Sequence, residues 1–350
     1  MSAVMNATAA EMNERSEGVW RAAWRRFKTD RVGLVSMGVV AIFLVMILLS
    51  ATGVVARNFQ QEVAVPNAPP SFLGARAAEK AAAAVAAPLT PNVDLSDIDP
   101  LAPRYAEWAE KAKQYHTTET VKATTLPLGA DRLGRDVLSK AQKGTEISVF
   151  VGVLAALVAT ILGTLLGASA GFFGKKVDDF LEWLYNVFTA IPDILLIFAF
   201  AAVLGRGIGT VVLILGLTGW TSLYRQVRAE FIKHRQREYV RAAEAIGASS
   251  FSRMFRHILP NVSHVVLVRM SLMVVGFIKS EVILSYLGLG VPVDQVSWGT
   301  MLAESQAELI LGYWWQLAAA TVFMAVFVTA FSLMADAWRD ALDTKLRGQE

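Results

Sequence analysis

Three long blocks of the chain contain no charged residue. They run from Leu34 to Ala56, from Ile147 to Gly174 and from Leu309 to Ala335. Because a hydrocarbon core about 30 Å thick needs about 20 apolar helical residues, each block is long enough to cross a membrane. The composition agrees, since 54% of the 350 residues are hydrophobic and 18% are charged, against about 45–50% and about 25% in soluble proteins. The pattern predicts an all-α, polytopic transmembrane helix bundle.

We predict six spans in all. Pro192 and Asp193 interrupt the third span, where neighbouring helices can satisfy the freed backbone groups, and should kink it. The fifth span contains Arg269, Lys279 and Glu281, so we expect it inside the bundle rather than facing lipid. The spans cover residues 32–55, 147–171, 181–204, 207–223, 264–287 and 312–335.

The basic residues orient these spans. Outside the long segment 57–146, most Lys and Arg residues lie in four places: before the first span, between the second and third spans at Lys175, in the loop 225–263, and after the last span. The segment 289–311 has no Lys or Arg. Cytoplasmic loops carry an excess of Lys and Arg, so both termini are predicted to be cytoplasmic. A cleavable signal peptide is the alternative for the first span, but its apolar core exceeds the usual length of about 7–15 residues.

Several kinds of chemistry find no support in the sequence. The chain has no cysteine, and His116, His234, His257 and His264 have no metal-ligand spacing, so we expect no metal site and no catalytic residue. No phosphate-binding GxxxxGK[ST] motif occurs, so we expect no cofactor bound by this chain, and energy must come from a partner. The net charge of +3 gives no reason to expect nucleic acid as a partner.

The long segment 57–145 is predicted to be a periplasmic insertion. It is rich in proline, and Ala77 to Ala87 has the composition of a short helix. A loosely folded insertion and a lid or docking surface for an external partner are both open. We expect residues 66–100 to tolerate deletion best, because their backbone should need little burial.

The cytoplasmic loop 225–263 has helical patterning. Tyr239, Ala242, Ala243 and Ile246 recur at the spacing of one helix face, and Gly247 suits the left-handed position that ends a helix. Either serine that follows can cap a second helix of the same spacing, formed by Phe251, Met254, Phe255 and Ile258 and stopped by Pro260. This pair could lie on anionic lipid headgroups or insert into a partner's groove, and the pattern favours neither.

At this loop the sequence resembles the permease subunits of bacterial ATP-binding-cassette (ABC) importers. Their signature is Glu-Ala-Ala, three residues, glycine, nine residues, then Ile-x-Leu-Pro. Arg241 to Gly247 carries the first half and Leu259-Pro260 ends the second, with Arg241 replacing the usual Glu and His257 the usual Ile.

Three more stretches resemble the dipeptide, oligopeptide and nickel branch of that family. The first is Leu128 to Ser139, before the second span. The second is Glu281 to Gly290 with Ser297 to Leu302, at the end of the fifth span and in the loop after it. The third is Trp338 to Asp343, near the C-terminus. Thr344 replaces the usual Pro at the end of the last stretch. The six-span count resembles the second-type permease of this branch, which adds one span before a core of five.

The resemblance implies a type I ABC importer permease in the bacterial inner membrane that imports di- or oligopeptides. Its implied partners are a second permease subunit in a heterodimer, two cytoplasmic ATPase subunits that use ATP and magnesium, a periplasmic substrate-binding protein and membrane lipid. The implied parts are a cytoplasmic segment 1–31, an anchor 32–56, the insertion 57–145, a permease domain 146–336 and a cytoplasmic tail 337–350. ATPase coupling is assigned to Tyr239, Ala242, Ala243, Glu244, Gly247, Phe251, Phe255, Leu259 and Pro260.

Other readings stay open from the residues. The same complex type could import nickel or another small solute, because the motifs are shared. An ion-driven secondary transporter would need paired ionisable groups and inverted repeats, which the sequence does not offer. Asp193 and Glu281 are candidates for the translocation pathway, with structural hydrogen bonds as the alternative for each.

The orientation can be tested with a reporter that is active only in the cytoplasm. Fused after Gly348 or inserted at Ser249, it should be active, and at Pro91 it should be silent. Activity at Pro91 would contradict the predicted orientation.

Overall fold

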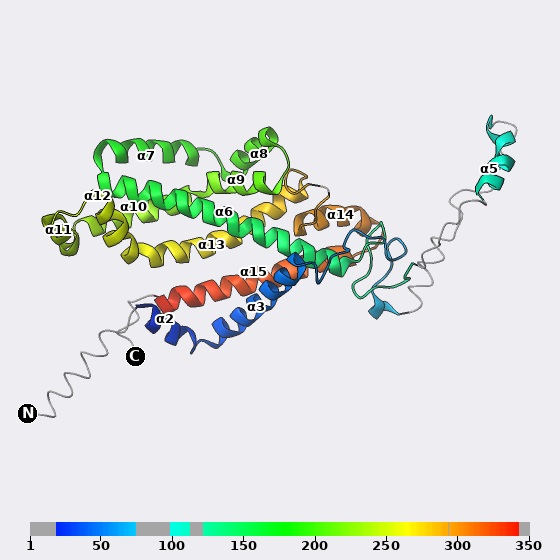
Figure 1. The fold of residues 1–350 in the computed structure, drawn as a ribbon, viewed down its shortest axis with the longest axis horizontal. Coiled ribbons are helices and arrows are strands. Elements are labelled where there is room, and N and C mark those ends of the chain that lie inside the picture. Colours follow the sequence, from blue (N-terminus) through cyan, green and yellow to red (C-terminus); the bar gives the residue numbers. More distant parts are fainter. Residues whose placement is uncertain (1–18, 75–98, 113–121, 293, 343–350) are drawn as a thin grey trace, which may run out of the picture. The chain divides into compact units, whose positions relative to one another are not determined.

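The computed structural model describes residues 19–74, 99–112, 122–292 and 294–342, and most of these residues are helical (Figure 1). Within these ranges β-structure is limited to isolated bridges. The all-α fold class is therefore confirmed. The α-helices are α2 (Val19–Phe27), α3 (Arg31–Ala51), α5 (Tyr105–Ala112), α6 (Val137–Phe173), α7 (Lys175–Thr189), α8 (Asp193–Leu204), α9 (Ile208–Gly219), α10 (Thr221–Arg235), α11 (Glu238–Ala245), α12 (Ser250–Ser252), α13 (Leu259–Tyr286), α14 (Trp298–Ile310) and α15 (Trp315–Leu342). Two short 3-10 helices, η1 (Ser71–Leu73) and η2 (Ala102–Arg104), and a π-helix, η3 (Arg253–Ile258), complete them.

The chain divides into two compact units, which are described separately. The helical unit holds Met1–Arg57, Ala141–Glu304 and Ala320–Glu350. The loop unit holds Asn58–Lys140 and Ser305–Ala319.

Four stretches of helix are long and apolar enough to cross a membrane by themselves. They are Arg31–Ala51, Val137–Phe173, Ser250–Tyr286 and Trp315–Leu342. Two pairs of consecutive helices meet the same criterion together, α7 with α8 across a bend of 85° and α9 with α10 across a bend of 41°. Counting each bent pair as one span gives six candidate spans in the predicted order.

The third predicted span is more sharply broken than a kink. Helix α7 ends at Thr189 and α8 begins at Asp193, with Pro192 as its N-cap (Figure 1). A proline has no N–H to donate and its ring blocks the preceding turn, so the helix restarts in a new direction.

The fourth predicted span ends too early in the sequence analysis. Residues 225–235, which we assigned to the cytoplasmic loop, continue α10 as far as Arg235. Leu223, Val227 and Phe231 of this helix are fully buried. Their spacing of four places them on one face, and the basic residues between them hide this face in the sequence.

Close packing of α6 against α10 forms the centre of the helical unit. Gly163, Gly167 and Gly171 lie one turn apart on α6, and each lacks room for a side chain. A Cβ atom would lie 2.8 Å from the carbonyl oxygen of Trp220 at the first glycine, and 2.7 Å from that of Tyr224 at the second. Small residues in membrane helices let backbones approach this closely. These glycines therefore fix the distance and the register between α6 and α10.

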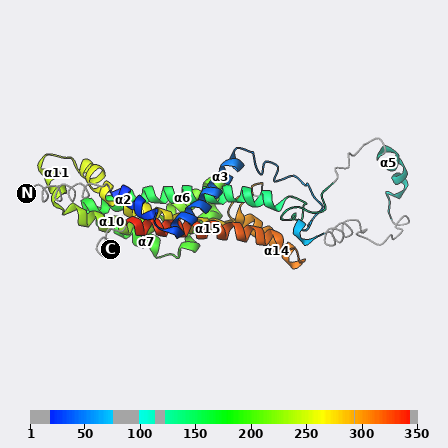
Figure 2. The same ribbon diagram turned by 90° about the horizontal axis from the view of Figure 1, so that it is seen from below.

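Helices α2 and α3 pack along α15, as both views of the fold show (Figures 1 and 2). The rings of Trp24 and Phe27 stack on Trp338 with centroid distances of 5.7 and 4.8 Å. Near the other end of α3, Ser50 donates a 2.6 Å hydrogen bond to Glu146 of α6. The first predicted span is therefore part of the helical bundle.

The loop unit is more ordered near its start than we expected. Antiparallel and parallel bridges pair Glu62 with Arg135, Ala64 with Ala123 and Pro70 with Leu126. Ala64 and Ala68 are completely buried. The premise of the expected deletion tolerance does not hold for residues 66–74, because their backbone pairs with a distant part of the chain. Residues 75–98, which include the proposed helix from Ala77 to Ala87, lie outside the described residues.

A single methyl group should have opposite effects at two helical glycines. Gly38→Ala on α3 meets no atom within 4 Å, so it should stabilise the chain by about 0.5–1 kcal/mol through helix propensity. Gly167→Ala forces α6 away from α10 and should destabilise it by about 1–3 kcal/mol. Thermal unfolding of the purified full chain in detergent measures both effects. Equal shifts for the two variants would show that the α6–α10 approach is not tight.

Candidate functional site

The segment that follows α10 forms a compact turn at one end of the helical unit (Figure 1). Helix α11 ends at Ala245, and Gly247, two residues later, has a φ of 84°, the left-handed conformation that the sequence predicted. The N–H groups of Gly247 and Ala248 donate to the carbonyl oxygens of Glu244 and Ala243 at 2.9 and 3.0 Å, which closes the end of the helix. The Ser249 side chain then accepts from the Ser252 N–H at 3.2 Å and caps the next helix.

The apolar residues of α11 divide between two faces. Val240 and Ala243 are buried, and Val240 packs in the same cluster as Phe231 and Met254. The predicted apolar face is otherwise exposed: Tyr239 and Ala242 reach solvent, and Ile246 is 85% exposed. Across the turn, Phe251 is 71% exposed. We call these four exposed residues, Tyr239, Ala242, Ile246 and Phe251, the apolar tip.

An ion pair, which we call the brace, joins the helix that carries most of the apolar tip to the π-helix η3. Arg253 of η3 forms a 2.6 Å salt bridge with Glu244 of α11. Its guanidinium also lies over the ring of Phe172, 5.4 Å from the centroid, near the end of α6. His234 of α10 contacts the Tyr239 hydroxyl at 2.7 Å. These contacts join α11 to η3, η3 to α6, and α10 to α11.

A polar cavity of about 710 Å³ lies behind this brace. Arg241, which replaces the usual Glu of the importer signature, lines it together with Arg235, Glu244 and Arg253. On the α7 side, Asp178 lines the cavity and accepts two hydrogen bonds from Arg228, at 2.5 and 2.8 Å. The substitution therefore adds a further positive charge to a cavity where Glu244 is already paired.

The second predicted helix of the loop is not stopped by Pro260. The helix runs on from Ser250 to Tyr286, and Pro260 is the second residue of α13. A π-helical turn at η3 immediately precedes it. Such a turn shifts the backbone hydrogen bonds by one residue, so the continuous helix accommodates Pro260, which has no N–H to donate. Phe255 and Leu259 are half-buried against the main core, and Phe255 supports Phe251 with ring centroids 4.5 Å apart.

The structure brings Tyr239, Ala242, Ala243, Glu244, Gly247 and Phe251 to one turn. The turn is followed, on the continuous helix, by Phe255, Leu259 and Pro260. Sequence reasoning missed Arg253, whose signal was only its position in a basic loop. It also missed the three glycines of α6, although their spacing of four residues is visible in the sequence.

The two pathway candidates lie in different surroundings. Asp193 is exposed at the first residue of α8, where a carboxylate interacts favourably with the helix dipole. Glu281 has no exposed area and accepts a 2.6 Å hydrogen bond from Ser285. This bond lies within α13, whereas the alternative for Glu281 was a structural hydrogen bond to a neighbouring helix. A pathway role remains a prediction for both.

The motif from Leu128 to Ser139 forms a charged clamp in the loop unit. Asp131 is buried and accepts 2.9 Å hydrogen bonds from the N–H groups of Leu133 and Arg135. It also pairs with buried Lys140 at 2.7 Å, and Lys140 reaches Gln316 at 3.1 Å. Burial by itself raises the pKa of the Asp131 carboxyl, but Lys140 and the Arg135 N–H outweigh it, so the pKa is lowered. The motif holds its own loop in shape.

Comparisons with known proteins agree with this architecture. Residues 163–348 match the family described as the binding-protein-dependent transport system inner membrane component. The chain belongs to this family. Residues 18–70 match a second family, the N-terminal TM domain of oligopeptide transport permease C. Family membership makes the chain a permease subunit of an ABC transporter and a multi-pass protein of the bacterial inner membrane.

Individual relatives are similar over most of the helical part. The oligopeptide transport system permease protein OppC of Bacillus subtilis is 35% identical over 67% of this chain and 78% of its own length. The dipeptide transport system permease protein DppC of the same organism is 36% identical over 63% of this chain and 68% of its own. The OppC protein of Escherichia coli K12 is 35% identical over 71% and 82%.

Removal of the buried lysine tests the charged clamp. Lys140→Met leaves the buried Asp131 carboxylate with the Arg135 guanidinium, 2.6 Å away, as its remaining cation, and should lower the free energy of unfolding by about 1–3 kcal/mol. The double variant Asp131→Asn, Lys140→Met should recover most of the loss. Because the pKa of Asp131 is lowered in the folded chain, the pair stabilises above the ordinary aspartate pKa and this stability is lost as pH falls.

Thermal unfolding of the full chain at several pH values measures these differences. The gap between the wild type and Lys140→Met should narrow as the medium becomes more acidic. A gap that is constant with pH would contradict the assignment of the stabilisation to this pair.

Proposed function

We propose that the chain is the membrane-spanning permease subunit of an ATP-driven importer that carries di- or oligopeptides across the bacterial inner membrane. The relatives named for oligopeptide and dipeptide transport support the substrate class. The motifs are shared with importers of nickel and other small solutes, which remain the alternative. In this proposal the chain binds no cofactor, and partner subunits use ATP and magnesium.

The complex would contain a second permease subunit, two cytoplasmic ATPase subunits and an external substrate-binding protein. The helical unit supports a common side for both termini, since Trp24 of α2 stacks on Trp338 near the end of α15. Helix α11 lies at the same end of the unit (Figure 1). The basic residues of α10 and α11 favour the cytoplasm for that end. Membrane lipid surrounds the remaining spans, and nothing in the charge favours nucleic acid.

The single observation that carries the coupling role is the apolar tip. Large apolar side chains such as Ile246 and Phe251 do not gain from exposure to water, and a cluster of them indicates an interaction site. A helix with small and apolar residues on its exposed face fits a groove in a partner. The brace of Arg253 would pass motion of that partner into α6 and α13 as a rigid body.

The ATPases would drive the cycle through this contact. A ligand shifts a conformational equilibrium only by its different affinities for the two states. ATP must therefore bind more tightly when the permeases are open to the outside. Closure of the ATPases around ATP would pull the apolar tips together and rock the spans between the two open forms.

Two substitutions should uncouple ATP hydrolysis from uptake. At Gly247 a Cβ atom meets nothing within 4 Å, so Gly247→Val acts through its positive φ alone, at a cost of about 1–2 kcal/mol. Ala242→Glu places a charge on the exposed face. Each should reduce ATP-dependent uptake by the reconstituted complex about tenfold while the subunits still assemble.

Matched variants serve as controls. Gly247→Asn tolerates the left-handed conformation, and Ala242→Ser keeps the size without the charge, so both should retain most of the uptake. Normal coupling in Gly247→Val and Ala242→Glu would instead favour a tip that lies on lipid headgroups. Failure of the chain to co-purify with an ATPase, or uptake driven by an ion gradient without ATP, would favour a secondary transporter.

A further inference from the structure

One face of α13 is exposed over the second half of the helix, from Gly276 onward, while Val268 and Leu272 on the same face are partly buried. Val268, Leu272, Gly276, Lys279 and Ile283 follow one another at steps of three or four residues, so they share one face. A Cβ atom at Gly276 would meet nothing within 4 Å, Lys279 is exposed and Ile283 is 44% exposed. We call this surface the open face of α13.

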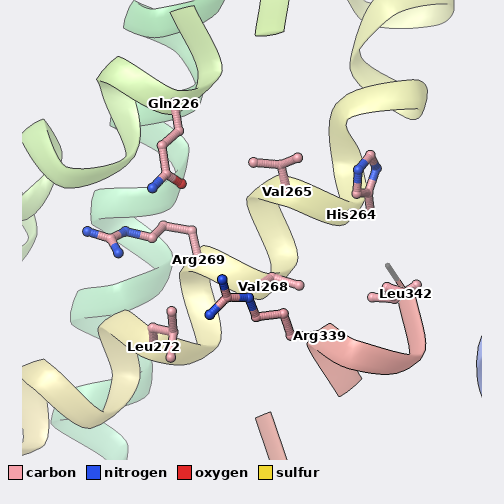
Figure 3. Close-up of a pocket in the computed structure, with 8 residues that line it drawn as sticks. All are labelled: Gln226, His264, Val265, Val268, Arg269, Leu272, Arg339 and Leu342. Carbon is pink, nitrogen blue, oxygen red and sulfur yellow. The ribbon is translucent and has the colours of Figure 1, made fainter. Parts of the chain in front are cut away.

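Near one end of the open face, α10, α13 and α15 enclose a cavity of about 370 Å³ (Figure 3). Gln226 comes from α10, Arg339 from α15, and His264 and Arg269 from α13. Figure 3 shows the amide of Gln226 pointing toward the Arg269 side chain, while the guanidinium groups of Arg269 and Arg339 lie apart along the cavity. The described residues that line the cavity include no Asp or Glu.

The charge of this cavity is uncompensated in the described part of the chain. The Nε atom of Arg269 is buried and has no hydrogen-bond partner there. A buried donor on a charged group is costly unless it is satisfied. Two arginines and a glutamine that line one cavity without an acid among its described residues form a site for an anion. A carboxylate fits, because arginine binds it with two parallel hydrogen bonds.

The anion could be a solute in a water-filled route or a lipid headgroup, and the position of Lys279 distinguishes the two. Lys279 lies ten residues after Arg269, which is about 15 Å along a helix. A cation exposed so far along a membrane span does not face lipid; such residues face water-filled cavities or the interior of a bundle. The open face is therefore better explained by an aqueous route than by a surface for lipid headgroups.

We propose that the open face of α13 lines a water-filled translocation pathway, in which Arg269 and Arg339 bind the carboxylate of the transported substrate. The inference rests on the proposed import function and adds a site within this chain. Val265, Val268 and Leu272 supply apolar walls beside the cations. The site would hold the acidic end of a substrate while leaving the rest free to move.

The absence of cysteine makes the pathway measurable. Leu272→Cys in the full chain, assembled with its partners in membrane vesicles, places one thiol in this chain beside the cavity. Its reaction rate is compared for the anionic sulfonatoethyl and the cationic trimethylammonioethyl methanethiosulfonates. Their ratio cancels any effect of the arginines on the thiol itself. The anionic reagent should react faster.

Substitution of both arginines should reverse this preference. Arg269→Gln with Arg339→Gln should lower the ratio of anionic to cationic rates about tenfold, because each lost charge acts on the two reagents in opposite directions. Arg269→Lys with Arg339→Lys keeps the charge and should keep the ratio. Arg225→Gln, a matched change on α10 away from the cavity, should alter it less than about twofold.

The alternatives give distinct results. Ile42→Cys on α3, which is 69% exposed and predicted to face lipid, should react with neither reagent. If Leu272→Cys behaves in the same way, or if its ratio ignores both arginines, the pathway inference is wrong. Failure of the proposed function would instead appear as no ATP-dependent uptake of any peptide by the wild-type complex, a measurement without the thiol.

The carboxylate itself is tested by protection. Trialanine at millimolar concentration should slow the reaction of Leu272→Cys with the neutral methyl methanethiosulfonate several-fold. Trialanine amide, which lacks the carboxylate, should not, and the double glutamine variant should lose the protection. Equal protection by both peptides, or by neither, would contradict a carboxylate site.

Discussion

The backbone contact between α6 and α10 governs the geometry of the helical unit. Gly163, Gly167 and Gly171 bring α6 so close to α10 that a Cβ atom would fall within 2.5–2.8 Å of a carbonyl oxygen at each glycine. At this distance the two helices can take only one register, because a shift of one residue would place side chains between the backbones. Helix α11 begins three residues after α10 ends. The position of the apolar tip thus depends on glycines far from it in the sequence.

Helix α11 has one face that packs in the core and another that forms most of the apolar tip. Val240 and Ala243 anchor α11 in the main cluster, while Tyr239, Ala242 and Ile246 remain exposed. The ion pair between Arg253 and Glu244 bridges α11 and the π-turn that leads into α13. A contact at the tip therefore acts on a helix that continues as far as Tyr286. This continuity gives a physical route from the apolar tip to the other end of the span.

The charged residues within the fifth span lie in different environments. Glu281 is fully buried, with one carboxylate oxygen hydrogen-bonded to Ser285 and the other without a hydrogen-bond partner among the described residues. Lys279 and the cavity at Arg269 lie on the open face. A membrane span tolerates such groups only where they contact protein or water. We therefore expect the open face to contact water or another protein rather than lipid.

The sequence by itself determined the number and order of the candidate spans, the all-helical class, the left-handed turn at Gly247 and the family, because these depend on local composition and spacing. The basic residues also predict an orientation for the chain. Tertiary structure alone decided that residues 225–235 continue a buried helix, that Pro260 lies within a continuous helix and that residues 66–74 pair with a distant loop. It also decided which side of α11 is buried and which cations share a cavity. Periodicity identifies the faces of a helix, but only the packed neighbours determine which face is covered.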